Sequence, residues 1–268
     1  MRTLYISELV GKAGVYCLKK TLGVLKKETR CDFVIVSANG ASGGKGLGKQ
    51  HAAYIKKMGV DVITTGPFCF YKKDLTQEMQ SFPFVLRPEN LQKDSLGRGR
   101  FIVSKEAGVL AVAVLLGQYN FDKMHSESPY YALEAVLEKL RAKTKNIVIE
   151  FYAEATAEKK TLFALADGRC SAVIGSYSRA LTADAGVSAA GTAFITDSGR
   201  TGSQLSVGGD DAETKIREYI SGIPEFTKES WLDLETQGVI LDFDEDGRSR
   251  SITPFRKKVT RCLAETER

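Results

Sequence analysis

Phe33-Val34-Ile35-Val36-Ser37-Ala38-Asn39-Gly40 sets a continuous apolar run directly before a loop of small and polar residues. Such a short run, rich in β-branched and aromatic side chains, is typical of a strand buried on both faces. Residues 13–27 and 51–58, on either side of it, show helical periodicity, and residues 4–6 and 60–64 are further short apolar runs. This β-α-β-α-β order predicts an α/β fold with a largely parallel sheet and right-handed crossovers.

The remainder of the chain continues to alternate between strand and helix signals. We expect helices at 130–143 and 212–220, and strands at 101–103, 109–116, 147–151, 172–174 and 193–197. Residues 239–243 and 250–255 predict a closing hairpin. Residues 71–107 are less regular and contain Pro83 and Pro88, which suggests a small cap-like excursion within a single domain spanning 1–268.

Composition excludes several classes of protein. The chain has 268 residues, of which 43% are hydrophobic, as in ordinary globular domains. Its longest apolar run, residues 109–116, is too short to span a bilayer, and the N-terminus lacks the pattern of a signal peptide. We therefore expect a cytoplasmic protein with no membrane partner. The net charge of +5 is dispersed, so nucleic acid is not an expected partner.

Cysteine and histidine usage gives no metal or disulfide pattern. The five cysteines are odd in number and none are paired at C-x-x-C spacing, so we expect free thiols. His51 and His125 are the only histidines, and we expect both to be ordinary surface residues.

Ligand sites of open α/β sheets form at the carboxyl ends of the strands. The loops that start there begin at Ser7, Ser37, Thr65, Tyr152, Gly175 and Asp197. Short sequence motifs within or near these loops include Gly44-Lys45-Gly46-Leu47, Ala153-Glu154-Ala155-Thr156, Thr182-Ala183-Asp184 and Ile195-Thr196-Asp197. In these motifs, and in order and spacing over nearly its full length, the chain resembles the YmdB-like branch of the calcineurin-like metallophosphoesterases. The resemblance implies a sandwich of two mixed β-sheets flanked by helices, a metal-dependent phosphodiesterase activity and self-association.

The residues that bind metal in that family differ here. Where the resemblance implies an aspartate, a glutamate, two asparagines and three histidines, this chain has Glu8, Asn39, Gly40, Pro67, Tyr152, Tyr177 and Arg179. The position implied for the general acid is Phe68. A guanidinium is a permanent cation and a phenol is a poor ligand at neutral pH. We therefore predict a degenerate homologue with no catalytic residue, no bound metal and no cofactor.

Loss of the metals would leave the carboxylate of Glu8 without a counter-charge. One hypothesis is that Arg179 replaces the lost cations and pairs with Glu8, while Tyr152, Tyr177 and Phe68 fill the space of the imidazoles. The alternative is that both charged side chains simply point to water.

The glycine-rich stretch Gly43-Gly44-Lys45-Gly46-Leu47-Gly48-Lys49-Gln50 matches G-x-x-x-x-G-K but ends in Gln50. It lacks the hydroxyl that binds Mg²⁺ in a P-loop, so anion binding by Gly44, Lys45 and Gly46 is a more plausible role than NTP hydrolysis. Three acidic residues near strand ends are candidates either for residual acid–base chemistry or, preferably, for helix caps and loop-orienting acceptors: Glu154, Asp184 and Asp197.

Three functions remain open. The leading one is a catalytically inactive homologue, a pseudoenzyme, that acts through protein–protein contacts or as an assembly component, with a homo-oligomer and a further protein partner expected. The second is a metal-free protein that binds a nucleotide or phosphate in the old cleft. The third is a divergent metal-dependent phosphodiesterase.

Overall fold

The computed structural model describes residues 1–121 and 124–261. Its helices are α1 (Gly11–Thr29), α2 (Lys49–Lys57), α3 (Lys73–Thr76), η1 (Met79–Ser81), α4 (Pro129–Arg141), α5 (Thr156–Ala166) and α6 (Ala212–Ser221). The strands are β1 (Arg2–Ile6), β2 (Glu8–Leu9), β3 (Phe33–Ser37), β4 (Val62–Thr64), β5 (Val85–Leu86), β6 (Arg100–Lys105), β7 (Gly108–Leu116), β8 (Ile147–Tyr152), β9 (Ala172–Ser176), β10 (Gly186–Val187), β11 (Ala193–Ile195), β12 (Arg200–Ser203), β13 (Leu234–Phe243) and β14 (Ser249–Val259).

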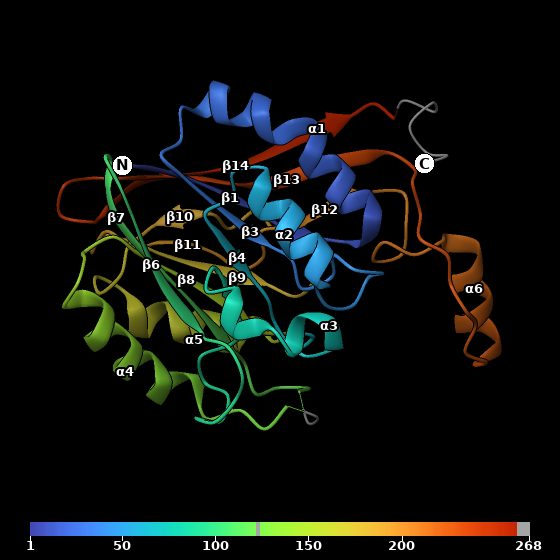
Figure 1. The fold of residues 1–268 in the computed structure, drawn as a ribbon, viewed down its shortest axis with the longest axis horizontal. Coiled ribbons are helices and arrows are strands. Elements are labelled where there is room, and N and C mark those ends of the chain that lie inside the picture. Colours follow the sequence, from blue (N-terminus) through green and yellow to red (C-terminus); the bar gives the residue numbers. More distant parts are fainter. Residues whose placement is uncertain (122–123, 262–268) are drawn as a thin grey trace.

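Two mixed sheets stack face to face and helices cover their outer faces (Figure 1). The first sheet has the order β2-β12-β13-β1-β3-β4-β5, with β14 paired to β13. Strands β1, β3, β4 and β5 are parallel, as the β-α-β-α-β order predicts. The second sheet has the order β10-β11-β9-β8-β7-β6, in which β7, β8, β9 and β11 are parallel. The predicted α/β sandwich is thus confirmed.

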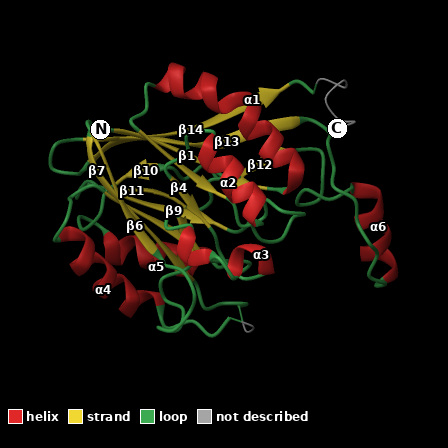
Figure 2. Ribbon diagram, viewed as in Figure 1, coloured by secondary structure: helices red, strands yellow, loops and turns green. Residues whose placement is uncertain are grey.

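The layers follow from where the apolar side chains lie. One core lies between the sheets, a second under α1 and α2, and a third under α4 and α5, so the order of layers is helix, sheet, sheet, helix (Figure 2). In α1 the residues Val15, Leu18, Leu22 and Leu25 recur at helical spacing and are all buried. Parallel strands buried on both faces explain the continuous apolar runs in the sequence.

Segment 71–107, expected to be an irregular excursion, contains β5 at the edge of the first sheet and β6 at the edge of the second, with α3, η1 and loops besides. The hairpin of β13 and β14 is longer than predicted. Helix α5 was not predicted from sequence, because its apolar residues form only a narrow stripe: Leu162, Phe163 and Ala166.

Among the described residues, no helix is long and apolar enough to cross a membrane.

One carboxyl group is buried between the two sheets. Glu150 on β8 is fully buried, and its Oε1 accepts hydrogen bonds from Ser37 Oγ at 3.0 Å and Ser176 Oγ at 2.9 Å. Its Oε2 accepts from the hydroxyl of Thr64. Burial raises the pKa of Glu150 despite these hydrogen bonds, because desolvation disfavours the charged form.

We expect Glu150→Gln to change how stability depends on pH. The raised pKa means that the folded chain holds this proton more tightly than the unfolded chain does. The wild type therefore loses stability as pH rises from about 4.3, the usual glutamate pKa, through the raised folded value. Urea unfolding of both proteins from acidic to neutral pH should show the variant gaining free energy of unfolding relative to the wild type. A difference that is constant across this range would contradict the assignment.

Candidate functional site: a cleft with a salt bridge at the strand tips

The carboxyl ends of strands from both sheets meet at one edge of the sandwich. Glu8 follows β1, Asn39 follows β3, Tyr152 ends β8 and Arg179 lies just after β9. Although far apart in sequence, these four side chains lie in one connected set of hydrogen bonds. The prediction that strand-end loops build the site is consistent with this arrangement.

The carboxylate of Glu8 is paired with the guanidinium of Arg179. Arg179 Nη2 and Nε lie 2.8 Å and 3.2 Å from Glu8 Oε1. The side chain of Glu8 is 1% exposed and that of Arg179 is 19% exposed. Arg179 also donates to the carbonyl oxygens of Gly208 at 2.6 Å and Gly44 at 3.1 Å. The hypothesis of pairing holds in this structure, and the alternative of two solvent-directed side chains does not.

Tyr152 and Asn39 complete the set of hydrogen bonds around the salt bridge. Tyr152 donates its hydroxyl hydrogen to Glu8 Oε2 over 3.4 Å and accepts from Asn39 Nδ2 at 3.1 Å. The side-chain oxygen Oδ1 of Asn39 accepts from the backbone N–H groups of Gly66 and Phe68. Burial, reinforced by the charge of Glu8, raises the pKa of Tyr152 well above its usual value. The phenol is therefore held neutral, and the side-chain amide of Asn39 fixes the loop that begins at Thr65.

Aromatic rings fill the space beside the salt bridge. Tyr152 and Tyr177 lie 5.9 Å apart between ring centroids, and Phe121 contacts both, at 6.1 Å and 5.7 Å. Phe68 lies apart from this trio and packs edge-on against Tyr71 at 4.7 Å. Sequence reasoning thus placed the two tyrosines together but missed Phe121, which lies in a segment without any strand or helix signal.

Gly40 lies so close to the salt bridge that a side chain at this position would require the paired side chains to shift. A Cβ atom there would lie 2.8 Å from Glu8 Oε1 and 2.9 Å from Arg179 Nη2. Real Cβ atoms are not found this close to such atoms, so the pair occupies the volume that any larger residue at position 40 would need. Pro67 lines the same cleft and has no backbone N–H to donate.

The loop after β9 holds its backbone in a strained form. Tyr177 and Arg179 have φ of 131° and 58°, a region that favours glycine. The carboxylate of Asp197 accepts the backbone N–H of Ser178 at 2.7 Å and that of Gly199 at 2.9 Å. Lys159, on α5, lies 3.5 Å from the same carboxylate. The buried pair of Lys159 and Asp197 therefore fixes the loop after β9.

The acidic residues considered for acid–base roles orient loops instead, but they do not cap helices in this structure. Glu154 accepts from the hydroxyl of Tyr177 at 2.6 Å, while the N-cap position of α5 is Ala155, which makes no side-chain hydrogen bond. Asp184 accepts from Thr182 and from the backbone and hydroxyl of Thr196. The preferred interpretation is therefore right about loop-orienting acceptors and wrong about helix caps, because these carboxylates accept hydrogen bonds from loop residues.

The glycine-rich loop lies at the rim of the cleft. Gly43, Gly44 and Gly46 have φ between 68° and 84°, and Gly43 and Lys45 are exposed. Lys49, the lysine of the G-x-x-x-x-G-K pattern, instead pairs with Glu78 at 2.6 Å. His51 bonds Ser42 beneath this loop and is half-buried, whereas His125 is exposed.

A groove of about 1300 Å³ opens from the salt bridge to α6. Its lining includes Gly44, Lys45, Phe68 and Tyr71, together with the aromatic trio and Arg179. Further lining residues come from 208–229, among them Tyr219 and Phe226. The sequence analysis did not predict the lining residues from 208–229. The pair Gly208-Gly209 directly before a helix was nevertheless a signal for a loop that could line a ligand site.

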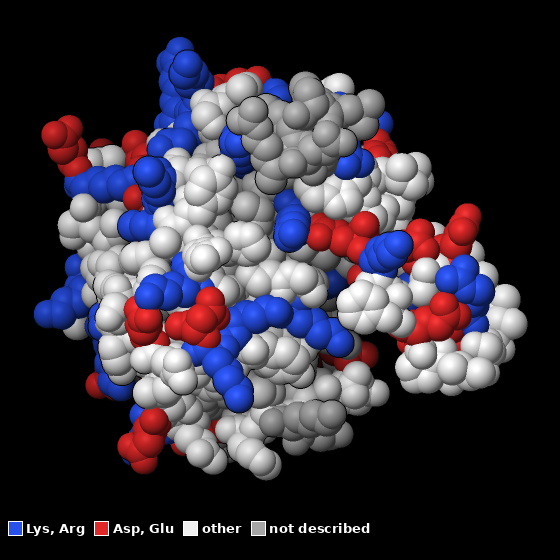
Figure 3. All heavy atoms as spheres, turned by 45° about the vertical axis from the view of Figure 1, so that its right-hand side comes forward, with Lys and Arg blue, Asp and Glu red and all other residues white. Residues whose placement is uncertain are grey.

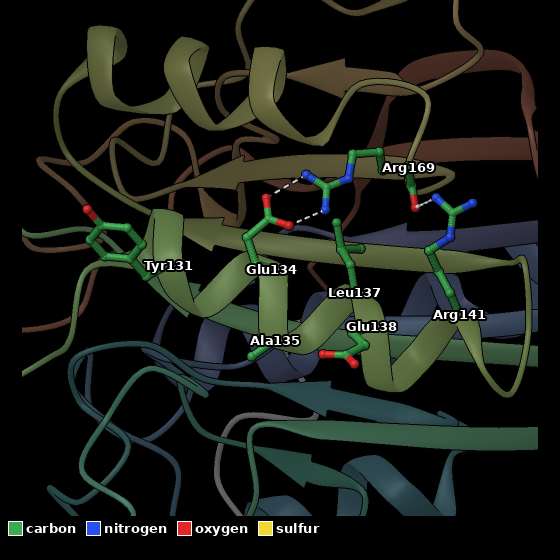
Figure 4. A pocket seen from close by; sticks show the side chains of 7 residues that line it. All are labelled: Tyr131, Glu134, Ala135, Leu137, Glu138, Arg141 and Arg169. Carbon is green, nitrogen blue, oxygen red and sulfur yellow. Dashed lines mark hydrogen bonds and ion pairs between the residues drawn. The ribbon is translucent and has the colours of Figure 1, made fainter.

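A smaller hollow of about 600 Å³ lies over α4, away from these residues (Figure 4). Glu134 and Arg169 form an exposed ion pair there, and Arg141 donates to the backbone carbonyl of Arg169 at 3.3 Å. None of the predicted site residues line it.

The residues at the implied metal positions do not fit a pair of divalent cations. The Glu8 carboxylate is already paired with the guanidinium of Arg179, and Asn39 and Tyr152 are hydrogen-bonded to each other. Within residues 1–121 and 124–261, no group of three or more His, Cys, Asp and Glu side chains is placed to hold a metal ion. Cys17, Cys31, Cys69 and Cys170 are free thiols, as expected, and Cys262 lies outside the described residues.

The chain matches the model of the YmdB-like protein family over residues 4–255. It belongs to the YmdB-like family. A relative from Bacillus subtilis (strain 168), a 2',3'-cyclic-nucleotide 2'-phosphodiesterase, is 31% identical over 245 residues, which cover 91% of this chain and 92% of the relative. The family therefore includes phosphodiesterases.

Two solved structures of similar length show the YmdB-like fold. A hypothetical protein from Thermus thermophilus matches with a TM-score of 0.89 and 29% identity, over 96% of this chain and 99% of its own. A phosphatase from Mycoplasma pneumoniae matches with a TM-score of 0.89 and 27% identity, over 96% and 93% of the two chains. The predicted family and the predicted sandwich are both confirmed.

Proposed function

We propose that this YmdB-like chain is a metal-free member of its family that acts through contacts with proteins rather than by two-metal hydrolysis. The observation that carries the proposal is the buried pair of Arg179 and Glu8. Two-metal hydrolysis needs cations that activate water and neutralise phosphate charge. Arg179 is a permanent cation paired with Glu8, the one carboxylate at these positions. Its charge repels divalent metal cations, and its side chain fills the volume that they would need. Phe68, at the implied general-acid position, carries no transferable proton.

The test is a measurement of metal content and turnover on the purified chain. We expect no stoichiometric manganese, iron or zinc, even after incubation with Mn²⁺. With 2',3'-cyclic nucleotides or a bis-aryl phosphate as substrate, turnover should not exceed that of the Glu8→Ala variant. The Bacillus subtilis relative serves as the positive control under identical conditions. Stoichiometric metal, or turnover that Glu8→Ala abolishes, would overturn the proposal in favour of a divergent metal-dependent phosphodiesterase.

A second candidate function is metal-free binding of a nucleotide or phosphate in the groove. It is favoured by the exposed Gly43–Lys45 loop, which faces the cleft beside stackable rings such as Phe68 and Tyr71. A ligand that binds only the native state raises the melting temperature. A thermal-shift panel of nucleotides and inorganic phosphate, repeated on Lys45→Met, distinguishes this function. A shift that Lys45→Met reduces supports it, and no shift at millimolar ligand contradicts it.

A further inference from the structure

A hollow of about 500 Å³ lies at the amino-terminal edge of the second sheet. It opens where β8 and β9 begin, whereas the cleft lies where these strands end. Four loops contribute to its lining: 142–146, 167–171, 188–192 and 244–248. The N-terminus marks this edge in Figure 1, since Phe243, directly before the last of these loops, is bonded to Met1. We call this cavity the amino-edge hollow.

Hydrogen bonds between the loops hold the amino-edge hollow in shape. The backbone N–H of Ser249 donates to the carbonyl oxygen of Gly191 at 2.8 Å, and its hydroxyl donates to the carbonyl oxygen of Ser171 at 2.7 Å. The backbone N–H of Gly168 donates to the hydroxyl of Thr192 at 2.9 Å. Three of the four loops are thereby joined, so the hollow needs little rearrangement to receive a ligand.

Cationic side chains gather around the amino-edge hollow. Its lining includes Arg141, Lys145, Arg169 and Arg248, with Asp246 as the acidic residue. The other described residues that line it are small and uncharged, and none has an aromatic ring. On the face drawn in Figure 3, by contrast, basic and acidic side chains are interspersed with wide uncharged areas. The hollow therefore collects positive charge at one place.

Two of these cations have no carboxylate partner in the described part of the chain. The guanidinium of Arg248 has no hydrogen bond or ion pair there, and its stem packs on Gly191, where a Cβ atom would lie 2.9 Å from Arg248 Cβ. Arg141 donates to the backbone carbonyl oxygen of Arg169 at 3.3 Å (Figure 4). Both guanidinium groups can therefore bind an anionic ligand without first breaking an ion pair.

The other two cations have counter-charges. Lys145 pairs with Asp246 at 2.7 Å, but these side chains are 65% and 74% exposed. Hydrogen bonding and charge from Lys145, followed by the charge of Arg248, lower the pKa of Asp246. Arg169 is bonded to Glu134, which lies outside the lining. Because an exposed pair contributes little, Lys145 can turn from Asp246 to a ligand with more negative charge.

Two further carboxylates in these loops are bonded to loop residues rather than to the four cations. Asp244 accepts the backbone N–H groups of Asp246 and Arg248, each at 2.9 Å. Asp167 accepts from the hydroxyl of Ser188. Neither carboxylate lines the hollow, so neither takes the place of an anionic ligand there.

We propose that the amino-edge hollow binds a compact polyphosphate, an anion with at least two phosphate groups and no ring system. The planar fork of a guanidinium matches two oxygens of a phosphate, and Arg141 and Arg248 offer two such forks. A volume of about 500 Å³ is within the range of small-molecule sites. Without aromatic rings, the lining offers a nucleobase nothing on which to stack. This site goes beyond the proposed function and does not depend on it.

The experiment titrates the full-length chain with pyrophosphate by calorimetry, without divalent metal, at low and at physiological ionic strength. We expect one site per chain, with an affinity that falls as salt screens the charges. Arg141→Met and Arg248→Met should each weaken binding at least ~10-fold, the effect of losing a hydrogen bond to a charged group. Circular dichroism should show both variants folded, because each replaced side chain is exposed.

Arg250→Met is the matched control. It removes the same charge from an exposed side chain two residues beyond Arg248, but Arg250 does not line the hollow. Its affinity should stay within about 2-fold of the wild type, because a screened charge outside the site acts weakly.

Three results would overturn the site. One is a wild-type chain that does not bind pyrophosphate at millimolar concentration. Another is an Arg250→Met variant that binds as weakly as Arg248→Met, which would mean a diffuse field rather than a site. The third is binding that Lys45→Met abolishes and both arginine variants keep, which would place the ligand in the cleft.

Discussion

Replacing Arg179 with methionine should lower the free energy of unfolding by about 3–5 kcal/mol, because it leaves the Glu8 carboxylate buried without a counter-charge. Glu8 is 1% exposed, and apart from Arg179 the side chain that hydrogen-bonds it in the described part of the chain is Tyr152, over 3.4 Å. The hydroxyl of a neutral phenol does not compensate a buried charge. Urea denaturation at neutral pH measures the loss.

Two controls separate the missing charge from the missing side chain. Glu8→Gln combined with Arg179→Met removes both charges and should recover at least half of the loss, since replacing both partners of a buried pair costs less than removing one. Arg169→Met breaks an exposed pair with Glu134 and should cost less than about 1 kcal/mol. An Arg179→Met variant no less stable than Arg169→Met would contradict a desolvated pair.

Lys159→Met should also destabilise the chain by about 3–5 kcal/mol. Lys159 and Asp197 have side chains only 4% and 1% exposed. Burial lowers the pKa of Lys159 and raises that of Asp197, and each charge offsets part of the shift of the other. Without the ammonium group, the Asp197 carboxylate is supported mainly by the backbone N–H groups of Ser178 and Gly199.

The adjacent residue gives a matched control for this variant. Lys160 pairs with Asp184 at 2.8 Å, but both side chains are open to solvent, at 47% and 31% exposure. Lys160→Met should therefore cost less than about 1 kcal/mol. Because Asp197 holds the strained loop, Lys159→Met should also speed hydrogen exchange at Ser178 more than Lys160→Met does. Equal effects of the two substitutions would contradict the conclusion that the pair of Lys159 and Asp197 is desolvated and holds the loop.

The fold could be predicted from sequence where burial leaves a periodic signal. Continuous apolar runs such as 33–36 mark strands buried on both faces, and α1 shows its apolar stripe. Helix α5 and the very short strands β2, β10 and β12 escaped prediction. Such elements are set by neighbouring chain segments rather than by their own pattern, so local propensity does not reveal them.

Within the site, the sequence predicted only the contact that an unpaired charge requires. A lone glutamate among non-ligands called for a cation, and Arg179 met that need across 171 residues of sequence. Nothing in the sequence placed Phe121 beside Tyr152 and Tyr177, or directed Lys159 at Asp197. Such contacts depend on how the two sheets stack, which periodicity does not encode.

The close approach of Gly40 to the salt bridge bears on the evolutionary history of this cleft. An asparagine introduced at position 40 alone would force both charged side chains to shift, and a histidine introduced at position 179 alone would remove the guanidinium that pairs with Glu8. Each of these single substitutions is therefore expected to destabilise the protein. The residue tolerated at position 40 therefore depends on the residue at position 179, and substitutions at the two positions should be non-additive.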